Sequence, residues 1–229
     1  MSTTEMNTPL RERDELQPTP QKWKILFFVP NLIGFVRLGL FIVMNAAFSD
    51  DIQTYCLLYV ASFTLDFFDG WAARALDQAT EFGAILDVAI DNLTRQTVWS
   101  RVSAPLGAFV AFVEWFTFAC TSCGRDNWKE RCFEEAPGII TRVVSNHFRN
   151  PWGALAITGL HFLPLCLLVF RESFGLLTPD TVLGQTYKLY GLYILGVLVA
   201  GRLLSAFCEF WLMGSYLSFI VDKDMRRRA

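Results

Sequence analysis

The chain alternates between long apolar stretches and short polar segments, and this pattern predicts a series of helices. A helix needs about 20 residues to cross a bilayer, with a range of about 17 to 25. The predicted spans cover residues 25–48, 54–68, 82–102, 105–121, 152–170 and 187–220. The second and fourth are short unless neighbouring residues are counted, so five or seven spans remain alternatives to six.

Composition supports a membrane protein. Of the 229 residues, 53% are hydrophobic and only 18% are charged, which is below the usual quarter for globular domains. The expected fold class is all-α, a polytopic membrane protein with about six transmembrane helices. We expect a polar tail at residues 1–22, a membrane domain at 23–221 and a basic tail at 222–229. The tail at 1–22 contains no apolar run and so is not expected to be a cleaved signal peptide.

Lysine and arginine positions predict the orientation of the spans. If both termini lie in the cytosol, the opposite side holds only Arg101, Arg171 and Lys188. This asymmetry agrees with the positive-inside rule. It places residues 66–91 in a polar cavity at the cytosolic face, which soluble substrates can reach.

Four aspartates at fixed spacings interrupt the apolar pattern. They are Asp66, Asp69, Asp87 and Asp91. Residues three or four apart share a helical face, so each consecutive pair points to one side. A polar run at residues 77–81 separates the pairs. The pattern predicts two helices joined by a short loop, each presenting two carboxylates to a common space.

Four carboxylates cannot all stay ionised in a low-dielectric site without a positive partner. Hard divalent cations prefer oxygen ligands, so the aspartates are candidate metal ligands. Arg74 is a bidentate donor suited to phosphate, while Gly70, Ala73 and Gly83 leave room for a ligand near the backbone. This chemistry indicates phosphoryl transfer with two metal ions. One aspartate pair alone would more often be a solvated helix face.

Other polar side chains inside the predicted spans are also expected to have a specific role, because burying them in a membrane is costly. Arg37 meets an anionic substrate group or neutralises a carboxylate, and the sequence leaves both open. Arg95 lies four residues after Asp91 and is expected to form a helix salt bridge with it. Glu114 binds a polyol acceptor or hydrogen-bonds a neighbouring helix. His161 is expected to be packed or hydrogen-bonded, not a ligand.

Three further features are expected to be structural. Arg202 and Glu209 lie two helical turns apart and are expected to pair. Residues 123–150 form the one sizeable polar loop, in which Arg142 and Arg149 contact substrate or are simply solvated. The six cysteines are scattered along the chain, and we expect free thiols in apolar surroundings.

The aspartate motif resembles that of a known family. From Asp66 to Asp91 the chain reads D-x2-D-G-x2-A-R-x8-G-x3-D-x3-D, which is similar to the signature of CDP-alcohol phosphatidyltransferases at every fixed position. Residues 28–37 and 73–87 further resemble the eukaryotic phosphatidylinositol synthases within that family. The close likeness covers residues 24–91, and beyond them it is weak.

The resemblance implies a two-metal transferase. Asp66, Asp69 and Asp87 would hold two Mg²⁺ or Mn²⁺ ions, with Asp91 close to the second and acting as the general base. The implied binding site for CDP-diacylglycerol comprises Gly70, Ala73, Arg74, Thr80 and Gly83. The acceptor hydroxyl, which belongs to myo-inositol in this branch, would attack the lipid-proximal phosphorus and release CMP. Candidate contacts to the acceptor or its phosphate are Arg37, Glu114, Arg142 and Arg149.

Two positions depart from the inositol branch. Asn92 stands directly after the last motif aspartate, where these enzymes usually carry arginine, and residues 115–121 offer no histidine after Glu114. Another acceptor, such as glycerol phosphate or serine, and a catalytically silent lipid-binding relative therefore stay as alternatives. An aspartate-rich prenyltransferase fits the glycine–alanine–arginine spacing poorly, and a cation carrier is a further alternative outside catalysis.

The resemblance also implies a cellular setting. It suggests a multi-pass protein of the endoplasmic reticulum that works among membrane lipids. Homodimers are common in the family. No nucleic-acid partner is expected.

Overall fold

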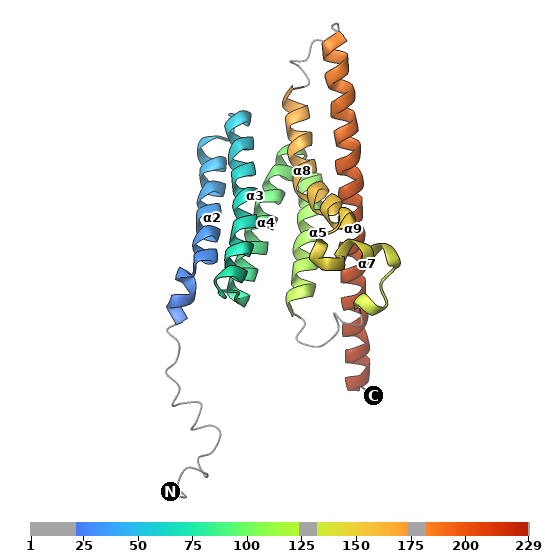
Figure 1. Cartoon of the computed structure of the whole chain (residues 1–229). Helices are drawn as coiled ribbons and strands as arrows, with labels where there is room; N and C mark the ends of the chain where they lie inside the picture. Colours follow the sequence, from blue (N-terminus) through green and yellow to red (C-terminus); the bar gives the residue numbers. More distant parts are fainter. Residues whose placement is uncertain (1–21, 124–131, 174–181, 229) are drawn as a thin grey trace, which may run out of the picture. The chain divides into compact units, whose positions relative to one another are not determined.

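In the computed structural model, residues 22–123, 132–173 and 182–228 are described, and every regular element among them is helical (Figure 1). The expected all-α class is therefore confirmed, while the predicted tail at residues 1–22 lies almost wholly outside the described residues. The elements are η1 (Lys22–Phe27), α2 (Val29–Ala47), α3 (Ile52–Ala75), α4 (Glu81–Val102), α5 (Ala104–Cys123), α7 (Gly138–Val144), η2 (Ser145–Phe148), α8 (Pro151–Ser173) and α9 (Val182–Arg228).

Each of the six predicted spans corresponds to a long helix, although several ends differ from the prediction. The helix α3 runs seven residues past the expected end at Phe68, and α9 continues through the segment expected to be a basic tail. Four stretches are long and apolar enough to cross a membrane: Val29–Ala47, Ala104–Ser122, Pro151–Glu172 and Leu189–Arg228. The chain is thus a polytopic membrane protein. The helices α3 and α4 are more polar because they carry the aspartate motif.

Polar side chains mark where the helices begin. Pro30 lies in the first turn of α2, where its missing N–H costs no hydrogen bond. At the start of α3, Asp51 accepts hydrogen bonds from the backbone N–H groups of Gln53 and Thr54 at 3.1 and 3.2 Å. The Thr54 hydroxyl also donates to Asp51 and holds the pKa of this exposed carboxyl below its ordinary value. Asn150 caps α8 by accepting from the Gly153 N–H at 2.9 Å.

The described chain divides into two compact units. The first comprises residues up to 49 together with 57–90, and the second comprises residues 50–56 and 91 onward. In the first unit, Gly34 of α2 lets Leu86 and Ile90 of α4 approach closely, because a Cβ atom there would lie 3.1 Å from the Leu86 side chain. Asp77 closes the α3–α4 turn with a left-handed backbone, φ 52°. The predicted short polar loop is therefore present.

In the second unit, α9 packs along α8 and α5, and Figure 1 shows α8 and α9 side by side. The tightest point is the crossing of Gly159 and Gly201, where a Cβ atom on either residue would collide with the backbone of the other helix. A buried cluster of Trp99, Val110, Leu163 and Leu198 joins α4, α5, α8 and α9. Small residues at the crossing are typical of helices that associate in membranes.

The described part of the segment 123–150 contains helical structure. Residues 138–148 form α7 and η2, and Ile140 and Val143 of α7 are buried against Ala156 and Cys208. The expectation of a solvated loop is wrong for these two side chains. Ile140 and Val143 give this short helix one buried face, which a span-length criterion does not detect.

Candidate functional site

Three of the four motif aspartates surround one arginine. Arg37 of α2 places its Nη1 atom 2.8 Å from Asp66 Oδ1, 2.8 Å from Asp69 Oδ2 and 2.6 Å from Asp87 Oδ1. Asp66 and Asp69 come from adjacent turns of α3, and Asp87 comes from α4. We refer to these four residues as the Arg37 cluster. Of the two roles left open for Arg37, the structure supports neutralisation of carboxylates.

The Arg37 cluster carries more negative than positive charge. With its three carboxylates ionised, one guanidinium leaves a net charge of −2. Arg37 is 1% exposed, whereas the side chain of Asp87 is 41% exposed, so one edge of the cluster is accessible. One oxygen from each carboxylate lies within 4.8 Å of the others. Hard divalent cations prefer this donor set, and the excess charge favours their binding.

A pocket of about 210 Å³ adjoins the Arg37 cluster in the same unit, and Asp69 and Asp87 line it. Its other walls include all five residues expected to bind the nucleotide lipid: Gly70, Ala73, Arg74, Thr80 and Gly83. The Arg74 guanidinium lies beside Gly70, since a Cβ atom on this glycine would be 3.6 Å from Arg74 Nη1. The pocket therefore combines carboxylates, a phosphate-binding cation and small residues.

Asn31 and Gln78 also line the pocket, although neither was predicted to have a role in the site. A Cβ atom at Gly83 would lie 2.7 Å from Asn31 Oδ1, closer than such atoms normally come. The Gly83 N–H donates to the Thr80 hydroxyl at 3.0 Å, which fixes the first turn of α4. Gln78 Oε1 accepts from the Val29 N–H at 2.9 Å and links the α3–α4 loop to α2. The sequence did place Asn31 and Gln78 inside the two segments that resemble phosphatidylinositol synthases, and this position could have indicated their role.

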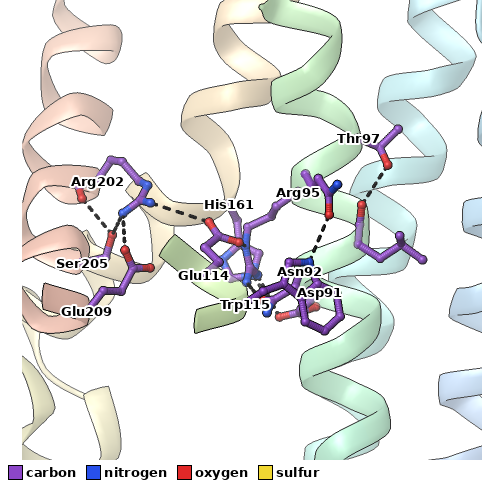
Figure 2. Close-up of polar contacts among 12 residues, drawn as sticks. Asp91, Asn92, Arg95, Thr97, Glu114, Trp115, His161, Arg202, Ser205 and Glu209 are labelled. Carbon is purple, nitrogen blue, oxygen red and sulfur yellow. Dashed lines mark hydrogen bonds and ion pairs between the residues drawn. The ribbon is translucent and has the colours of Figure 1, made fainter. Parts of the chain in front are cut away.

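The fourth motif aspartate, Asp91, belongs to a different set of contacts in the second unit (Figure 2). Its Oδ2 atom accepts from Arg95 Nη1 at 3.1 Å, which confirms the expected helix salt bridge. His161 Nε2 lies 3.2 Å from the same oxygen and 2.8 Å from Arg95 Nη1. The Nδ1 atom of His161 lies 3.0 Å from the Ile157 carbonyl, which can only accept. This arrangement favours a proton on Nδ1 and leaves Nε2 to accept from Arg95.

The contacts of Asp91 extend through two further carboxylates. Arg95 Nε donates to Glu114 Oε2 at 3.0 Å, and Arg202 Nη2 lies 3.7 Å from Glu114 Oε1. Arg202 Nη1 donates to Glu209 at 2.9 Å, which confirms the predicted pair (Figure 2). We refer to Asp91, Arg95, Glu114, His161, Arg202 and Glu209 as the Arg95 network. It joins α4, α5, α8 and α9.

Two buried polar atoms beside Arg95 lack a hydrogen-bond partner among the described residues. They are Asn92 Nδ2 and Glu114 Oε1. Asn92 is 3% exposed and its Oδ1 atom already accepts from Arg95 Nη2 at 2.6 Å. Because buried polar atoms normally find partners, these two are candidate contacts for a polar ligand.

The remaining candidates lie elsewhere. Arg142 ends α7 and Arg149 follows η2, and both are exposed in the second unit, outside the Arg95 network. The five cysteines whose side chains are described, at 56, 120, 132, 166 and 208, are free, as expected. The expectation that His161 is packed or hydrogen-bonded is confirmed, but the sequence did not indicate its proximity to Asp91, 70 residues away. No local spacing could have indicated that contact.

Comparison with known proteins agrees with the motif. Residues 27–126 match the family described as CDP-alcohol phosphatidyltransferase. The CDP-diacylglycerol–inositol 3-phosphatidyltransferase of Schizosaccharomyces pombe is 53% identical over 69 residues, 30% of this chain and 29% of the relative. Its human counterpart is 47% identical over 68 residues, 30% of this chain and 32% of the relative. The first such protein of Arabidopsis thaliana is 35% identical over 100 residues, 42% and 44% of the two chains.

The matched segments span less than half the length of these relatives. No solved structure is detectably similar to the chain. The family match covers the segment that holds the aspartate motif, the Arg37 cluster and the adjoining pocket. Over residues 27–126, the chain is thus similar to the CDP-alcohol phosphatidyltransferase family.

Proposed function

We propose that this chain transfers a phosphatidyl group from CDP-diacylglycerol to myo-inositol, giving phosphatidylinositol and CMP. The observation that carries the proposal is the Arg37 cluster, an excess of carboxylates beside a pocket that holds Arg74 and three small residues. The names of the relatives from yeast, plant and human support the donor and the acceptor. The same reaction with another alcohol is the neighbouring alternative.

The cluster fits divalent cations. Asp66, Asp69 and Asp87 would hold two Mg²⁺ or Mn²⁺ ions, and Asp91, one turn further along α4, would lie near the second. When bound, the ions would supply positive charge to the diphosphate of the donor. Arg37 holds the three carboxylates together and offsets part of their mutual repulsion.

The pocket is suited to the nucleotide end of the donor lipid. Arg74 supplies the planar donor set that binds phosphate oxygens in pairs. Gly70, Ala73 and Gly83 have little or no side chain, so a bulky ligand can come close to the backbone. The Thr80 hydroxyl, which already holds the Gly83 N–H, offers a further polar contact.

Asp91 is the proposed general base. It takes the proton from the acceptor hydroxyl while the acceptor oxygen forms a bond to the lipid-proximal phosphorus. The phosphoanhydride bond breaks, and CMP leaves with the bonding electron pair. Arg95 donates to Asp91 Oδ2 and also contacts His161 Nε2, and we propose that His161 holds Arg95 in the position that sets the direction of this carboxylate. Geometric placement matters more for such a base than its intrinsic strength.

The acceptor side is proposed to lie in the Arg95 network. Asn92 Nδ2 and Glu114 Oε1 offer one donor and one acceptor that have no hydrogen-bond partner among the described residues, although Glu114 Oε1 lies 3.7 Å from Arg202 Nη2. A polyol can satisfy both kinds of atom at once, since each hydroxyl donates and accepts. Arg142 and Arg149 are exposed and would reach only a substrate approaching from their side of the chain.

The setting follows from the same proposal. We place the protein in the endoplasmic reticulum membrane with both termini in the cytosol and with a homodimer as its expected assembly. The donor and the product are both membrane lipids, so their acyl chains stay in the bilayer throughout the reaction.

The deciding experiment measures CMP release from CDP-diacylglycerol by the purified full-length protein. The assay is run with and without myo-inositol, with Mg²⁺ or Mn²⁺, beside the Asp91→Asn variant. Inositol-dependent release that the variant loses is the expected result. Release that requires glycerol phosphate or serine would keep the chemistry and change the acceptor. Metal-dependent binding of the donor without any release would overturn catalysis and leave a lipid-binding relative.

A further inference from the structure

A large groove lies in the second unit, away from the residues of the proposed reaction. It has a volume of about 740 Å³ and is bounded by the C-terminal part of α9 and by residues 132–135. None of its lining residues belongs to the Arg37 cluster, the Arg95 network or the pocket beside Arg74. The proposed transferase function therefore does not explain it.

The floor of the groove is one face of α9. Gly214, Ser215 and Ser218 line it, and they follow the three- and four-residue spacing of a helical face. A Cβ atom at Gly214 would meet nothing within 4 Å, so the space above this residue is open. Small side chains at these positions leave room for a ligand along the helix.

One end of the groove is apolar and rigid. Phe210, Trp211 and Phe219 line this end. The Trp211 Nε1–H donates to the backbone carbonyl of Cys132 at 3.1 Å, which fixes the opposite wall. Val113, Met213 and Tyr216 form a buried cluster with Cys132 beneath it. This end offers a surface for hydrocarbon.

The other end is basic. Lys223, Arg226 and Arg227 line it, against the two acidic side chains of Asp222 and Glu135. Lys223 Nζ lies 5.7 Å from the centre of the Phe219 ring, so cationic and aromatic chemistry meet at this boundary. Arg228 follows directly in sequence. Clusters of Lys and Arg at the end of a membrane helix attract anionic lipid headgroups.

The two ends are separated by the depth of one membrane leaflet. Sixteen residues separate Phe210 from Arg226, which on an α-helix spans about 24 Å. Half of a bilayer, with its headgroups, measures about 20–22 Å. Both residues fall within the apolar stretch Leu189–Arg228, which is long enough to cross a membrane.

From this match in chemistry and length, we propose that the groove binds one anionic phospholipid. Its phosphate lies among Lys223, Arg226 and Arg227, and one acyl chain follows α9 over Gly214 toward Phe210 and Trp211. A free anion would not use the aromatic end. A zwitterionic lipid would gain less from the three cations.

The test uses the full-length protein, purified in detergent and stripped of lipid. It is offered phosphatidylglycerol or phosphatidylcholine, and native mass spectrometry counts the bound lipids. Wild-type protein is expected to retain one phosphatidylglycerol molecule in preference to phosphatidylcholine. The double variant R226Q/R227Q is expected to lose phosphatidylglycerol binding by about tenfold or more and to leave phosphatidylcholine unchanged.

A second pair of variants tests the groove itself. Gly214→Leu fills the open floor and is expected to reduce phosphatidylglycerol binding. Gly196→Leu makes the same change on the same helix, also in open space but outside the groove, and is expected to have no effect. Asp69→Asn, which alters only the proposed reaction site, is expected to keep full binding. This result would separate the groove from the transferase proposal.

Three outcomes would overturn the proposal. They are equal retention of the two lipids by wild-type protein, equal binding by Gly214→Leu and Gly196→Leu, and displacement of phosphatidylglycerol by equimolar inorganic phosphate. The last would identify a site for a free anion. If R226Q/R227Q elutes as an aggregate, the glycine pair decides, because neither leucine meets a neighbouring atom at its Cβ position.

Discussion

The Arg37 cluster and the Arg95 network are both built from buried arginines and carboxylates, yet they differ in charge. The first sets one arginine against three carboxylates, and the second sets two arginines against three. With all carboxylates ionised, the first has a net charge of −2 and the second, with His161 neutral, of −1. The second also spreads its charge over four helices. The more negative charge indicates that the Arg37 cluster still needs cations, whereas the charges of the Arg95 network are largely neutralised by its own side chains.

The two sites also differ in how far their carboxylates are exposed. Asp87 exposes 41% of its side chain in the Arg37 cluster, whereas Glu114 exposes only 4% in the Arg95 network. A cluster that must bind and release ions needs an open side. A network that orients other groups gains from exclusion of water, because hydrogen bonds to charged groups are stronger in a low dielectric. We therefore assign ion binding to the first and orientation to the second.

The largest expected effect comes from removing one carboxylate of the Arg37 cluster. Asp69→Asn is expected to lower CMP release by about a thousandfold, as when a group that stabilises transition-state charge is removed. Its unfolding temperature without metal should not fall, because the change relieves repulsion between like charges. The assay is CMP release at saturating Mg²⁺, with thermal unfolding measured in parallel.

The matched control for Asp69→Asn is Asp77→Asn in the α3–α4 loop. Asp77 has a left-handed backbone, which asparagine also tolerates, and it lies outside the cluster. Its activity should stay near that of the wild-type protein. Equal losses in the two variants would mean that the cluster has no special role and would remove the distinction drawn above.

The next effect compares the two arginines. Arg95→Met leaves Glu114 buried, with Arg202 at 3.7 Å as its remaining ion pair among the described residues, and loss of one partner from a buried pair costs about 3 kcal/mol of unfolding free energy or more. Arg37→Met removes the guanidinium that contacts all three carboxylates of the proposed metal site. Its stability should recover when Mg²⁺ or Mn²⁺ is added, whereas that of Arg95→Met should not.

Thermal unfolding in detergent, with chelator and then with metal, measures this contrast. Arg95→Lys is the control because it keeps the charge but loses the branched contacts to Glu114, Asp91 and Asn92. An intermediate stability is expected for it. If metal restored the stability of both Arg37→Met and Arg95→Met, or of neither, the proposed roles of ion binding for the Arg37 cluster and orientation for the Arg95 network would be contradicted.

A smaller effect is expected where α8 crosses α9, next to Arg202. A methyl group at Gly159 would meet the backbone of Gly201 and Arg202. Gly159→Ala should therefore lower the free energy of unfolding by about 2 kcal/mol, the usual cost of overpacking. Gly196→Ala has open space around it and should be neutral or slightly stabilising. Similar unfolding temperatures for the two variants would show that α8 and α9 can move apart at this crossing without loss of stability.

The sequence predicted what depends on local spacing. The 3.6-residue period of a helix was enough to pair Asp66 with Asp69, and the polar run at 77–81 was enough to place the turn before Asp87. It did not predict how Arg37 would be used, because Arg37 lies 32 residues from Asp69 and 50 from Asp87. Those contacts depend on how α2, α3 and α4 pack.

The Arg95 network shows the same limit more clearly. The pairs at four and seven residues, Arg95 with Asp91 and Arg202 with Glu209, were predicted and are present. His161 of α8 and Asp91 of α4 lie 70 residues apart in the sequence, and no helical spacing predicts that they come close together. The buried part of α7 was missed for a related reason, since seven residues are too few to give a clear helical pattern.

The smallest effect tests whether the Arg95 network orients Asp91. His161→Ala removes the acceptor that holds Arg95, which itself donates to Asp91 Oδ2, and a hydrogen bond to a charged group is worth about 1.5–3 kcal/mol, so kcat should fall by about tenfold or more. The KM for CDP-diacylglycerol should stay unchanged, because the donor pocket lies in the first unit. His161→Gln keeps a polar group that can accept from Arg95 and should recover part of the lost kcat. If His161 had a purely structural role, both variants would have a lower unfolding temperature, and kcat would not fall while KM stays unchanged. The Arg95 network would then only support the packing of the helices.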